Sequence, residues 1–480
     1  MNERVDVIIV GAGLSGIGAA CHLRRELPGK SFAILEGRES IGGTWDLFRY
    51  PGIRSDSDML TFGYSFEPWR GSKALADGAS ILAYIRETAR KYEVDRAIRF
   101  GHRVTRASWS TADAAWTVEA TRADGTALTI TASFLWMCTG YYRYEAGHTP
   151  EFPGRERFRG PVVHPQRWPE GLDYAGKRVA VIGSGATAVT LVPAMAGDAA
   201  HVTMVQRSPT YIMSLPGQDP VAAALRRLLP ERVAYPIARW KNITLATFIY
   251  QLARRRPERM KTWLIDQVRR ALGPGHDVAT DFTPRYMPWD QRLCFVPDGD
   301  LFAALRAGKA SVATGAIETF TETGLRLDTG EEVEADVIVT ATGLDLLFFG
   351  GAELVVDGAA LVPHELVTYK GVMLSGVPNL AFTVGYINSS WTLRADLIAR
   401  HVCDLLRHMD RRGARVVTPR RGSDVETERL LGLSSGYVER SVDRFPRQGT
   451  HAPWRAPQNY FLDLASLRLA PLASPALDFE

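Results

Sequence analysis

The sequence predicts an α/β protein with two dinucleotide-binding units and a helical insertion. Two apolar, β-branched stretches each run through a glycine-rich turn into a helix pattern: "VDVIIVGAGLSGIGAACHLRREL" at 5–27 and "KRVAVIGSGATAVTLVPAMA" at 177–196. A basic segment with helical spacing lies between 221 and 275. Strand, glycine turn and helix together form the Rossmann-like unit that binds a nucleotide diphosphate at a helix N-terminus. A chain of 480 residues has room for two or three such domains.

The composition is that of an ordinary soluble protein, with 46% apolar and 23% charged residues. The four cysteines lie far apart, and no His/Cys cluster has metal-ligand spacing, so we predict a reducing compartment and no metal site. No uninterrupted apolar stretch reaches the roughly 18 residues of a membrane span, and the N-terminus enters a strand pattern at once. We therefore expect a cytoplasmic protein, with no nucleic acid as partner.

The first unit fits the dinucleotide fingerprint G-x-G-x-x-G at Gly11, Gly13 and Gly16. The first glycine permits the tight turn, the second lets the backbone approach a pyrophosphate, and the third allows close helix–strand packing. The next strand, "SFAILE", ends in Glu36, twenty residues after Gly16. A carboxylate at this place can accept hydrogen bonds from an adenosine ribose.

The second unit has the pattern G-x-G-x-x-A, and its following strand, "HVTMVQRSPTYI", has no acid where an NAD site would place one. It offers Arg207 and Ser208 instead. A guanidinium binds a 2′-phosphate through two hydrogen bonds, whereas a carboxylate would repel it, so we predict NADPH as the second nucleotide. The predicted loop residues are Gly183, Ser184, Gly185, Ala186 and Thr187.

Two apolar strands end in Thr-Gly turns, at Gly140 and Gly343, where the chain can cross between the two nucleotide domains. These turns set the predicted boundaries. The first domain is expected at 1–144 and 346–480, the NADPH domain at 145–215 and 290–345, and the helical insertion at 216–289.

The strip "GGTWDLFRYPGIRSD" at 42–56 indicates the nucleotide of the first domain. Its glycine pair lets the backbone run close to a flat ring system, and Trp45 can form one wall of a slot for that ring. Both features favour FAD over a second nicotinamide nucleotide. A helix that starts after Ser390 can face a reduced, anionic flavin. NADPH with FAD limits the chemistry to hydride transfer. The chain has no suitably spaced pair of redox-active cysteines, so the reduced flavin is expected to pass its electrons to molecular oxygen or to an external acceptor.

The same strip matches [AG]-G-x-W-x4-[FY]-P-[GM]-x3-D, and "FRGPVVHPQRWP" at 158–169 matches F-x-G-x3-H-x3-W-P. With the two fingerprints, nearly the whole chain resembles the class B flavoprotein monooxygenases of the Baeyer–Villiger type. The resemblance implies that NADPH reduces FAD and that a C4a-peroxyflavin formed with oxygen converts ketones to esters or lactones. Sulfides or thioamides could be oxygenated by the same intermediate.

A peroxyflavin anion needs a fixed cation and exclusion of water. By resemblance, Arg292 in "MPWDQRLCFVPDGD" supplies the cation, Asp56 orients it, and Arg54 contacts the phosphate or nicotinamide side of NADP. The alternative is that Arg292 pairs with Asp290 on a surface loop. His164 belongs by resemblance to a hinge between the domains. The FAD contacts carried over are Ser15, Gly43, Thr44, Trp45 and Val104.

The segment 221–275 holds twelve basic and three acidic residues, a local charge of +9 in a chain of +4. It predicts a solvated basic face beside an apolar face packed on the body; a peripheral membrane contact and an oligomer contact are the alternatives. For the whole chain, an N- or S-oxygenating monooxygenase and a ferredoxin-reductase-like electron donor stay open. So does a non-catalytic nucleotide-binding scaffold at a membrane surface.

Overall fold

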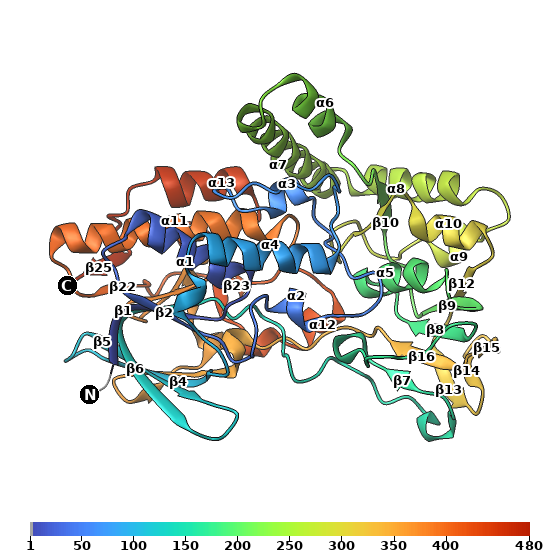
Figure 1. Cartoon of the computed structure of the whole chain (residues 1–480), viewed down its shortest axis with the longest axis horizontal. Helices are drawn as coiled ribbons and strands as arrows, with labels where there is room; N and C mark the ends of the chain where they lie inside the picture. The colour runs from blue at the N-terminus through green and yellow to red at the C-terminus, as the bar shows by residue number, and fades with distance from the viewer. Residues whose placement is uncertain (1–2) are drawn as a thin grey trace.

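Two sheets with parallel strands at their centres lie side by side in the computed structural model, which describes residues 3–480 (Figure 1). The first has nine strands in the order β18-β17-β4-β5-β6-β1-β2-β3, with β21 paired to β6. The second has five, in the order β12-β9-β8-β16-β7, and all its neighbours are parallel. The predicted α/β class with two Rossmann-like units is confirmed.

The first sheet is covered on both faces. In β1, Val7 and Ile9 pack in a core with α1 and α11, while Ile8 and Val10 pack in a second core under β4 and β5. A parallel strand buried on both sides has to be apolar throughout, as this one is. The bounds are β1 Glu3–Val10, β2 Phe32–Leu35, β3 Ile98–Arg99, β4 Arg103–Ser110, β5 Ala115–Thr121, β6 Ala127–Met137, β17 Glu353–Val356, β18 Ala359–Ala360, β21 Leu380–Phe382, α1 Leu14–Glu26 and α11 Trp391–Arg412.

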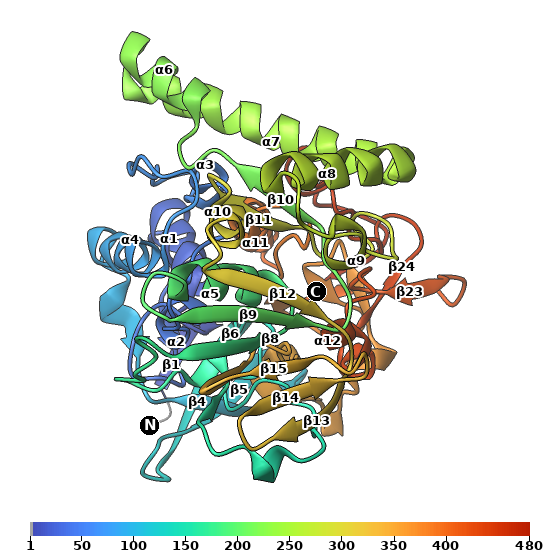
Figure 2. The same ribbon diagram turned by 90° about the vertical axis from the view of Figure 1, so that its right-hand side faces the viewer.

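The second sheet has α5 and α10 against one face and a three-stranded antiparallel sheet, β13-β14-β15, against the other. Figure 2 shows its strands stacked beneath the helices of the insertion. The bounds are β7 Val162–Val163, β8 Arg178–Ile182, β9 His201–Gln206, β12 Ala310–Thr314, β16 Val337–Thr340, β13 Ile317–Thr321, β14 Gly324–Leu327, β15 Glu332–Glu334, α5 Ala186–Met195 and α10 Asp300–Arg306.

The helical insertion leaves the second unit after β10 and re-enters it at β11, and these two strands pair in parallel. Its long helix α7 extends along one edge of the molecule with α8 beside it (Figure 2). Within residues 3–480, no helix combines the length and the apolar character needed to cross a membrane. The bounds are β10 Ile212–Leu215, α6 Pro220–Leu228, α7 Glu231–Arg255, α8 Pro257–Leu272, α9 Val278–Asp281 and β11 Cys294–Pro297.

The C-terminal part of the chain returns to the first unit, because β17 pairs with β4, β21 pairs with β6, and α11 packs on α1. Smaller elements complete the fold around the two units. They are α2 Thr44–Leu47, α3 Met59–Phe62, α4 Gly78–Lys91, β19 Val367–Tyr369, β20 Met373–Leu374, β22 Val417–Pro419, β23 Thr427–Arg429, α12 Gly436–Glu439, β24 Arg447–Gly449, α13 Tyr460–Leu464 and β25 Leu477–Phe479.

Candidate active site

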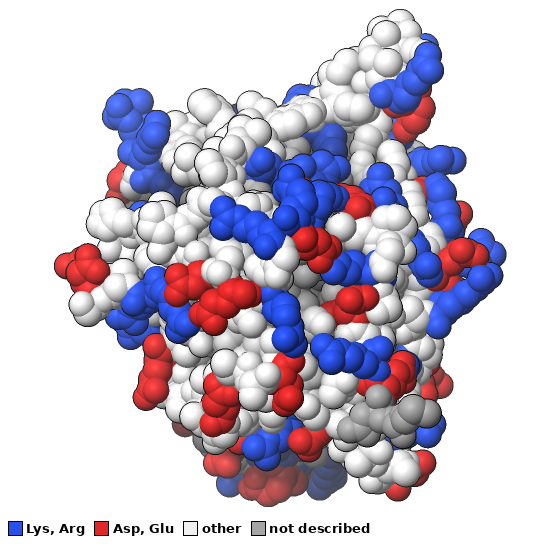
Figure 3. Space-filling model, turned by 90° about the vertical axis from the view of Figure 1, so that its left-hand side faces the viewer, with Lys and Arg blue, Asp and Glu red and all other residues white. Residues whose placement is uncertain are grey.

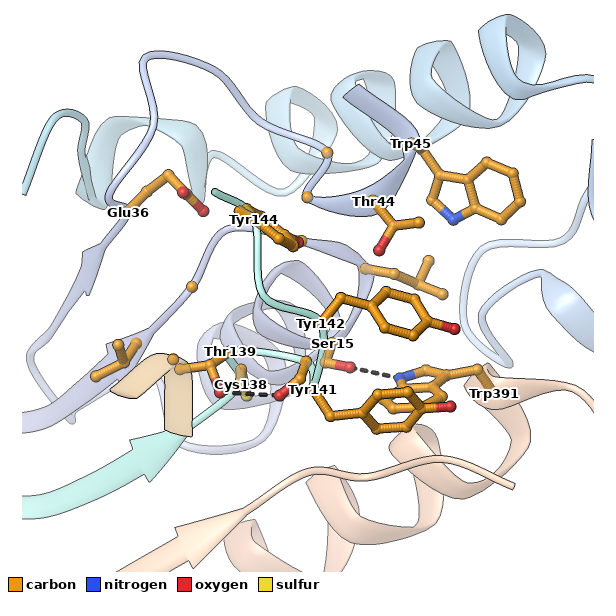
Figure 4. Close-up of a pocket in the computed structure, with 18 of the residues that line it drawn as sticks. Ser15, Glu36, Thr44, Trp45, Cys138, Thr139, Tyr141, Tyr142, Tyr144 and Trp391 are labelled. Atoms are coloured by element: carbon orange, nitrogen blue, oxygen red, sulfur yellow. Dashed lines mark hydrogen bonds between the residues drawn. The ribbon is translucent and has the colours of Figure 1, made fainter. Parts of the chain in front are cut away.

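A cavity of about 350 Å³ lies at the carboxyl ends of β1 and β2, where α1 begins (Figure 4). Most residues predicted to contact FAD line it together, and Gly16 is the exception. The lining includes Gly11, Gly13, Ser15, Glu36, Gly43, Thr44, Trp45 and Val104. Gly16 packs beneath the loop, since a Cβ there would lie 1.8 Å from the carbonyl oxygen of Gly11. That is the packing role predicted for the third glycine.

The glycine loop of this cavity is built for close approach. Gly11 has φ +104°, and a Cβ on it would lie 2.6 Å from the Cys138 oxygen. Gly13 is the N-cap of α1 and supplies no side-chain cap, so first-turn N–H groups of the helix stay available. Gly43, with φ +55°, packs against Gly13. The strip 42–56 thus closes over a cradle suited to a diphosphate.

Glu36 marks the far end of the first cavity. One carboxylate oxygen accepts from the Ala12 N–H at 2.7 Å and the other from the Arg38 N–H at 2.9 Å. Burial raises the pKa of Glu36 although both hydrogen bonds act to lower it. The ribose contact predicted for this carboxylate stays a prediction.

Aromatic residues that the sequence reasoning missed complete this cavity. Trp391, the first residue of α11, donates from its indole nitrogen to Ser15 Oγ at 2.8 Å (Figure 4). The ring of Tyr141 lies 5.2 Å from that of Trp391, and Tyr142 and Tyr144 follow it along the wall. The stretches "CTGYYRY" and "NSSWT" at the ends of two strands were the available signal.

A second cavity, of about 780 Å³, lies at the start of α5. Gly183 has φ +132°, and a Cβ on it would lie 2.3 Å from the Ala341 oxygen. Gly185 caps α5 without a side-chain bond, and a Cβ there would meet nothing within 4 Å. The buried hydroxyl of Tyr286, in this lining, has no hydrogen-bond partner among residues 3–480. The predicted residues in the lining are Arg54, Gly183, Ser184, Gly185, Ala186, Thr187, Arg207 and Ser208.

The cations of this second cavity differ in their surroundings. Arg207 is exposed. Arg54 already contacts Asp300, with its two terminal nitrogens 2.5 and 3.3 Å from the carboxylate oxygens. Arg440, which the sequence reasoning missed, also lines the cavity, and burial lowers its pKa. Arg440 directly follows the short helix α12, and its sequence surroundings gave no nucleotide-binding signal.

The two cavities meet at a shared set of residues. Arg292 lies there in an ion pair with Asp56, and each side chain is 29% exposed. Asp290 pairs instead with Arg254 at 2.8 Å, so the surface pairing of Arg292 with Asp290 does not occur. The residues common to both linings are Thr44, Trp45, Ser55, Asp56, Tyr142 and Arg292.

The charge on Arg292 is strongly held. Burial acts to lower the pKa of Arg292, but the Asp56 carboxylate outweighs it and the pKa is raised. Burial also raises the pKa of Tyr437, in the second cavity, to about 12. At neutral pH the junction therefore presents a permanent cation beside a protonated phenol, an arrangement that stabilises developing negative charge.

His164 lies away from this junction and is absent from the described linings of both cavities. Its Nε2 is 3.2 Å from the Gly343 oxygen, and its Nδ1 accepts from the Gln166 N–H at 3.2 Å. It thus joins the connection after β7 to the turn after β16, and its hinge role stays a prediction.

Comparison with known families agrees with this geometry. A model of an NAD(P)-binding Rossmann-like domain matches residues 9–72, and the flavin-binding monooxygenase-like model matches residues 73–408. The chain belongs to the flavin-binding monooxygenase-like family. The monooxygenase class predicted from the sequence is confirmed at this level.

Relatives within this family match over the full length. The motifs "VIGSGATAVTLVPA" and "PWDQRLC" of this chain predict a likeness to the ethionamide-activating FAD monooxygenase. The FAD-containing monooxygenase EthA of Mycobacterium tuberculosis is 53% identical over 481 residues, which cover 100% of this chain and 98% of the relative. EthA of Mycolicibacterium smegmatis is likewise 53% identical over 481 residues, with the same coverage.

Solved structures share the fold. An oxidized steroid monooxygenase bound to NADP is similar with a TM-score of 0.73 and 25% identity, over 87% of this chain and 88% of that one. An open structure of cyclohexanone monooxygenase has a TM-score of 0.72 and 22% identity, over 87% and 90% of the two chains. At 22% identity, the similarity to cyclohexanone monooxygenase concerns the fold alone.

Proposed function

We propose that this flavin-binding monooxygenase uses FAD, NADPH and molecular oxygen to insert an oxygen atom into ketones, giving esters or lactones, and also oxygenates sulfides or thioamides. The observation that carries the proposal is the junction of the two cavities at Arg292 and Asp56. It supports a reaction in which a nicotinamide and a flavin meet beside one fixed cation. The names of the EthA relatives, FAD-containing monooxygenases, support the flavin.

The residues present fit both cofactors. The glycine loop before α1 would hold the FAD diphosphate, Glu36 its ribose, and Trp45 would flank the flavin ring. The loop before α5 would hold the NADPH diphosphate, with Arg207 at the 2′-phosphate. Bound FAD, once reduced by NADPH, would supply the activation of molecular oxygen.

The chain's own contribution is electrostatic and steric. Arg292 provides a positive charge at the junction, and Asp56 fixes its orientation, so little reorganisation is needed when negative charge develops. Trp45 and Tyr142 wall the junction and limit the entry of water. Arg54, held by Asp300, is proposed to lie on the nicotinamide side.

The test is Arg292→Ala. We expect the variant to bind FAD and to be reduced by NADPH at nearly the wild-type rate in anaerobic stopped-flow measurements. Ester formation, followed by mass spectrometry with labelled oxygen on a ketone panel, should fall about 100- to 1000-fold. Arg285→Ala, an exposed arginine outside both described linings, is the matched control.

Ester formation at a near wild-type rate in Arg292→Ala would contradict the role of Arg292. If wild-type enzyme produced only hydrogen peroxide across ketones and sulfides, the monooxygenase proposal itself would fail. Rapid turnover with an added electron acceptor would then favour a reductase. Oxygenation of amines and sulfides without ester formation would favour the N- or S-oxygenating branch, against which the fingerprint ending in Trp168-Pro169 speaks.

A further inference from the structure

Helix α7 packs one face on the body and exposes several large apolar residues on another. Ala234, Tyr235 and Ala238 face the body, whereas Trp240 is 44% exposed and Phe248 62% exposed. Only part of the apolar surface predicted to pack on the body is therefore buried there. The exposed apolar residues Val233, Ile237, Trp240 and Phe248 are separated by steps of three, four or eight residues, so they form one stripe along the helix.

The stripe continues onto the C-terminal helix α13. The ring of Trp240 lies 5.7 Å from that of Tyr460 and 6.2 Å from that of Phe461. Phe461 and its neighbour Leu462 are themselves exposed, Leu462 by 57%. We call the exposed apolar side chains of α6, α7 and α13 the insertion surface: Val221, Leu228, Val233, Ile237, Trp240, Leu245, Phe248, Leu252, Phe461 and Leu462. Contiguous apolar exposure on this scale marks an interaction site.

Unpaired cations accompany the insertion surface. Of the twelve basic residues between 221 and 275, five form ion pairs. The other seven have no ion pair within the described chain. These seven are Arg227, Arg232, Arg255, Arg256, Arg259, Lys261 and Arg270. Figure 3 shows uncharged atoms along the upper edge of one face, reaching the projecting tip at α6, with Lys and Arg side chains beside them.

We propose that the insertion surface docks on an anionic lipid bilayer. Apolar side chains, two of them aromatic on α7, would enter the boundary between headgroups and acyl chains, and the surrounding arginines would meet lipid phosphates. A second copy of this chain fits less well, because a two-fold interface would bring like-charged arginines of both copies together. The membrane contact stands independently of the proposed oxygenation.

The experiment is co-sedimentation of the holoenzyme with vesicles of phosphatidylcholine that contain about 30% phosphatidylglycerol. Wild-type protein should bind these vesicles, release them at high salt, and bind pure phosphatidylcholine weakly. The triple variant Arg255→Gln, Arg256→Gln, Arg259→Gln should lower binding about 100-fold, or fivefold per charge removed. The double variant Ile237→Asp, Phe248→Asp should abolish it.

Two substitutions control for charge and exposure elsewhere. Arg122→Gln removes an exposed arginine that has no ion pair within the described residues, and Val362→Asp alters an exposed apolar residue outside the insertion surface. Both should bind like wild type, and NADPH oxidation in solution should be unchanged in every variant, which shows that each one is folded.

Equal binding to neutral and anionic vesicles, or full binding by the Ile237→Asp, Phe248→Asp variant, would overturn the proposal. So would a dimer in analytical ultracentrifugation that the same two substitutions dissociate while vesicle binding is absent. In that case the insertion surface would be the contact between two copies.

Discussion

The indole nitrogen of Trp391 donates a hydrogen bond of 2.8 Å to Ser15 Oγ, which joins residues 376 positions apart in the chain. The contact ties the first turn of α11 to the first turn of α1. Both residues line the first cavity, so the bond holds two helix N-termini in a fixed relation around the predicted flavin site.

Trp391→Phe removes this bond and keeps an aromatic ring. Because one hydrogen bond contributes about 1 kcal/mol, the dissociation constant of FAD should rise about fivefold. Trp109→Phe is the matched control, since it loses an indole hydrogen bond of 3.1 Å to Thr111, and neither residue is in the described lining of the cavity. Fluorescence titration of each apoenzyme with FAD measures the dissociation constants. If Trp391→Phe bound FAD as tightly as the wild-type protein, a positioning role for Trp391 would be contradicted.

Asp56→Asn removes the carboxylate that holds Arg292. Reduction by NADPH should persist, while coupled oxygenation falls about 10- to 100-fold, the loss expected for a hydrogen bond to a charged group. Hydrogen peroxide should take the place of ester. Asp290→Asn, whose carboxylate pairs with Arg254, should leave coupling unchanged. Parallel assays of hydrogen peroxide and ester measure how much of the consumed NADPH yields oxygenated product. An unchanged ratio in Asp56→Asn would argue against the orienting role of Asp56.

Gly185→Ala separates nucleotide binding from stability. An added Cβ on Gly185 would meet nothing within 4 Å, and its φ of −80° suits any residue, so the melting temperature should not change. The methyl group would stand where the diphosphate approaches, and KM for NADPH should rise by about tenfold or more. Gly183→Ala, by contrast, should cost about 1–3 kcal/mol of stability because of its φ of +132°. An unaltered KM in Gly185→Ala would place the diphosphate elsewhere.

The buried His22 gives stability a pH dependence. Burial acts to lower the pKa of His22, but its hydrogen bonds to Asp396 at 3.2 Å and Glu26 at 3.0 Å outweigh it, and the pKa is raised above 6.5. The folded state therefore holds this proton more tightly than the unfolded state. The stabilisation is complete below pH 6.5 and is lost as pH rises through the raised pKa. Two arginines also face the cluster: Arg239 lies 3.7 Å from Asp396, and Arg407 lies 3.8 Å from Glu26.

His22→Gln should therefore lower the free energy of unfolding by about 2 kcal/mol at mildly acidic pH, and by less as the pH rises. Urea unfolding across a pH series measures the difference between the two proteins. His364→Gln, an exposed histidine, is the control. A difference that grew with rising pH would show that His22 is not the protonated partner of Asp396.

Local signals correctly predicted the two glycine turns and the helices that follow them. A strand, a glycine turn and a helix are close in the chain, and the constraint on Gly11 and Gly183 is a backbone constraint that only glycine meets. The ion pair between Arg292 and Asp56 had no local signal and was expected only through the family resemblance. Trp391 was missed for the same reason, because its partner Ser15 lies on another element.

The insertion is where sequence reasoning was least reliable. Helical periodicity correctly placed its helices, but periodicity does not say which side of a helix faces the body. The buried face of α7 combines Ala234 and Ala238 with Tyr235, whereas Trp240 and Phe248 turn outward.

The six residues shared by the two cavities have an evolutionary consequence. A change at Thr44, Trp45 or Tyr142 alters the walls of both cavities at once, so such positions cannot adapt to the ligand of one cavity independently of the other. Substitutions that change one site are therefore expected at residues that line only one of the two cavities. New substrate preferences should therefore arise through the peripheral loops, while the junction is inherited as one unit.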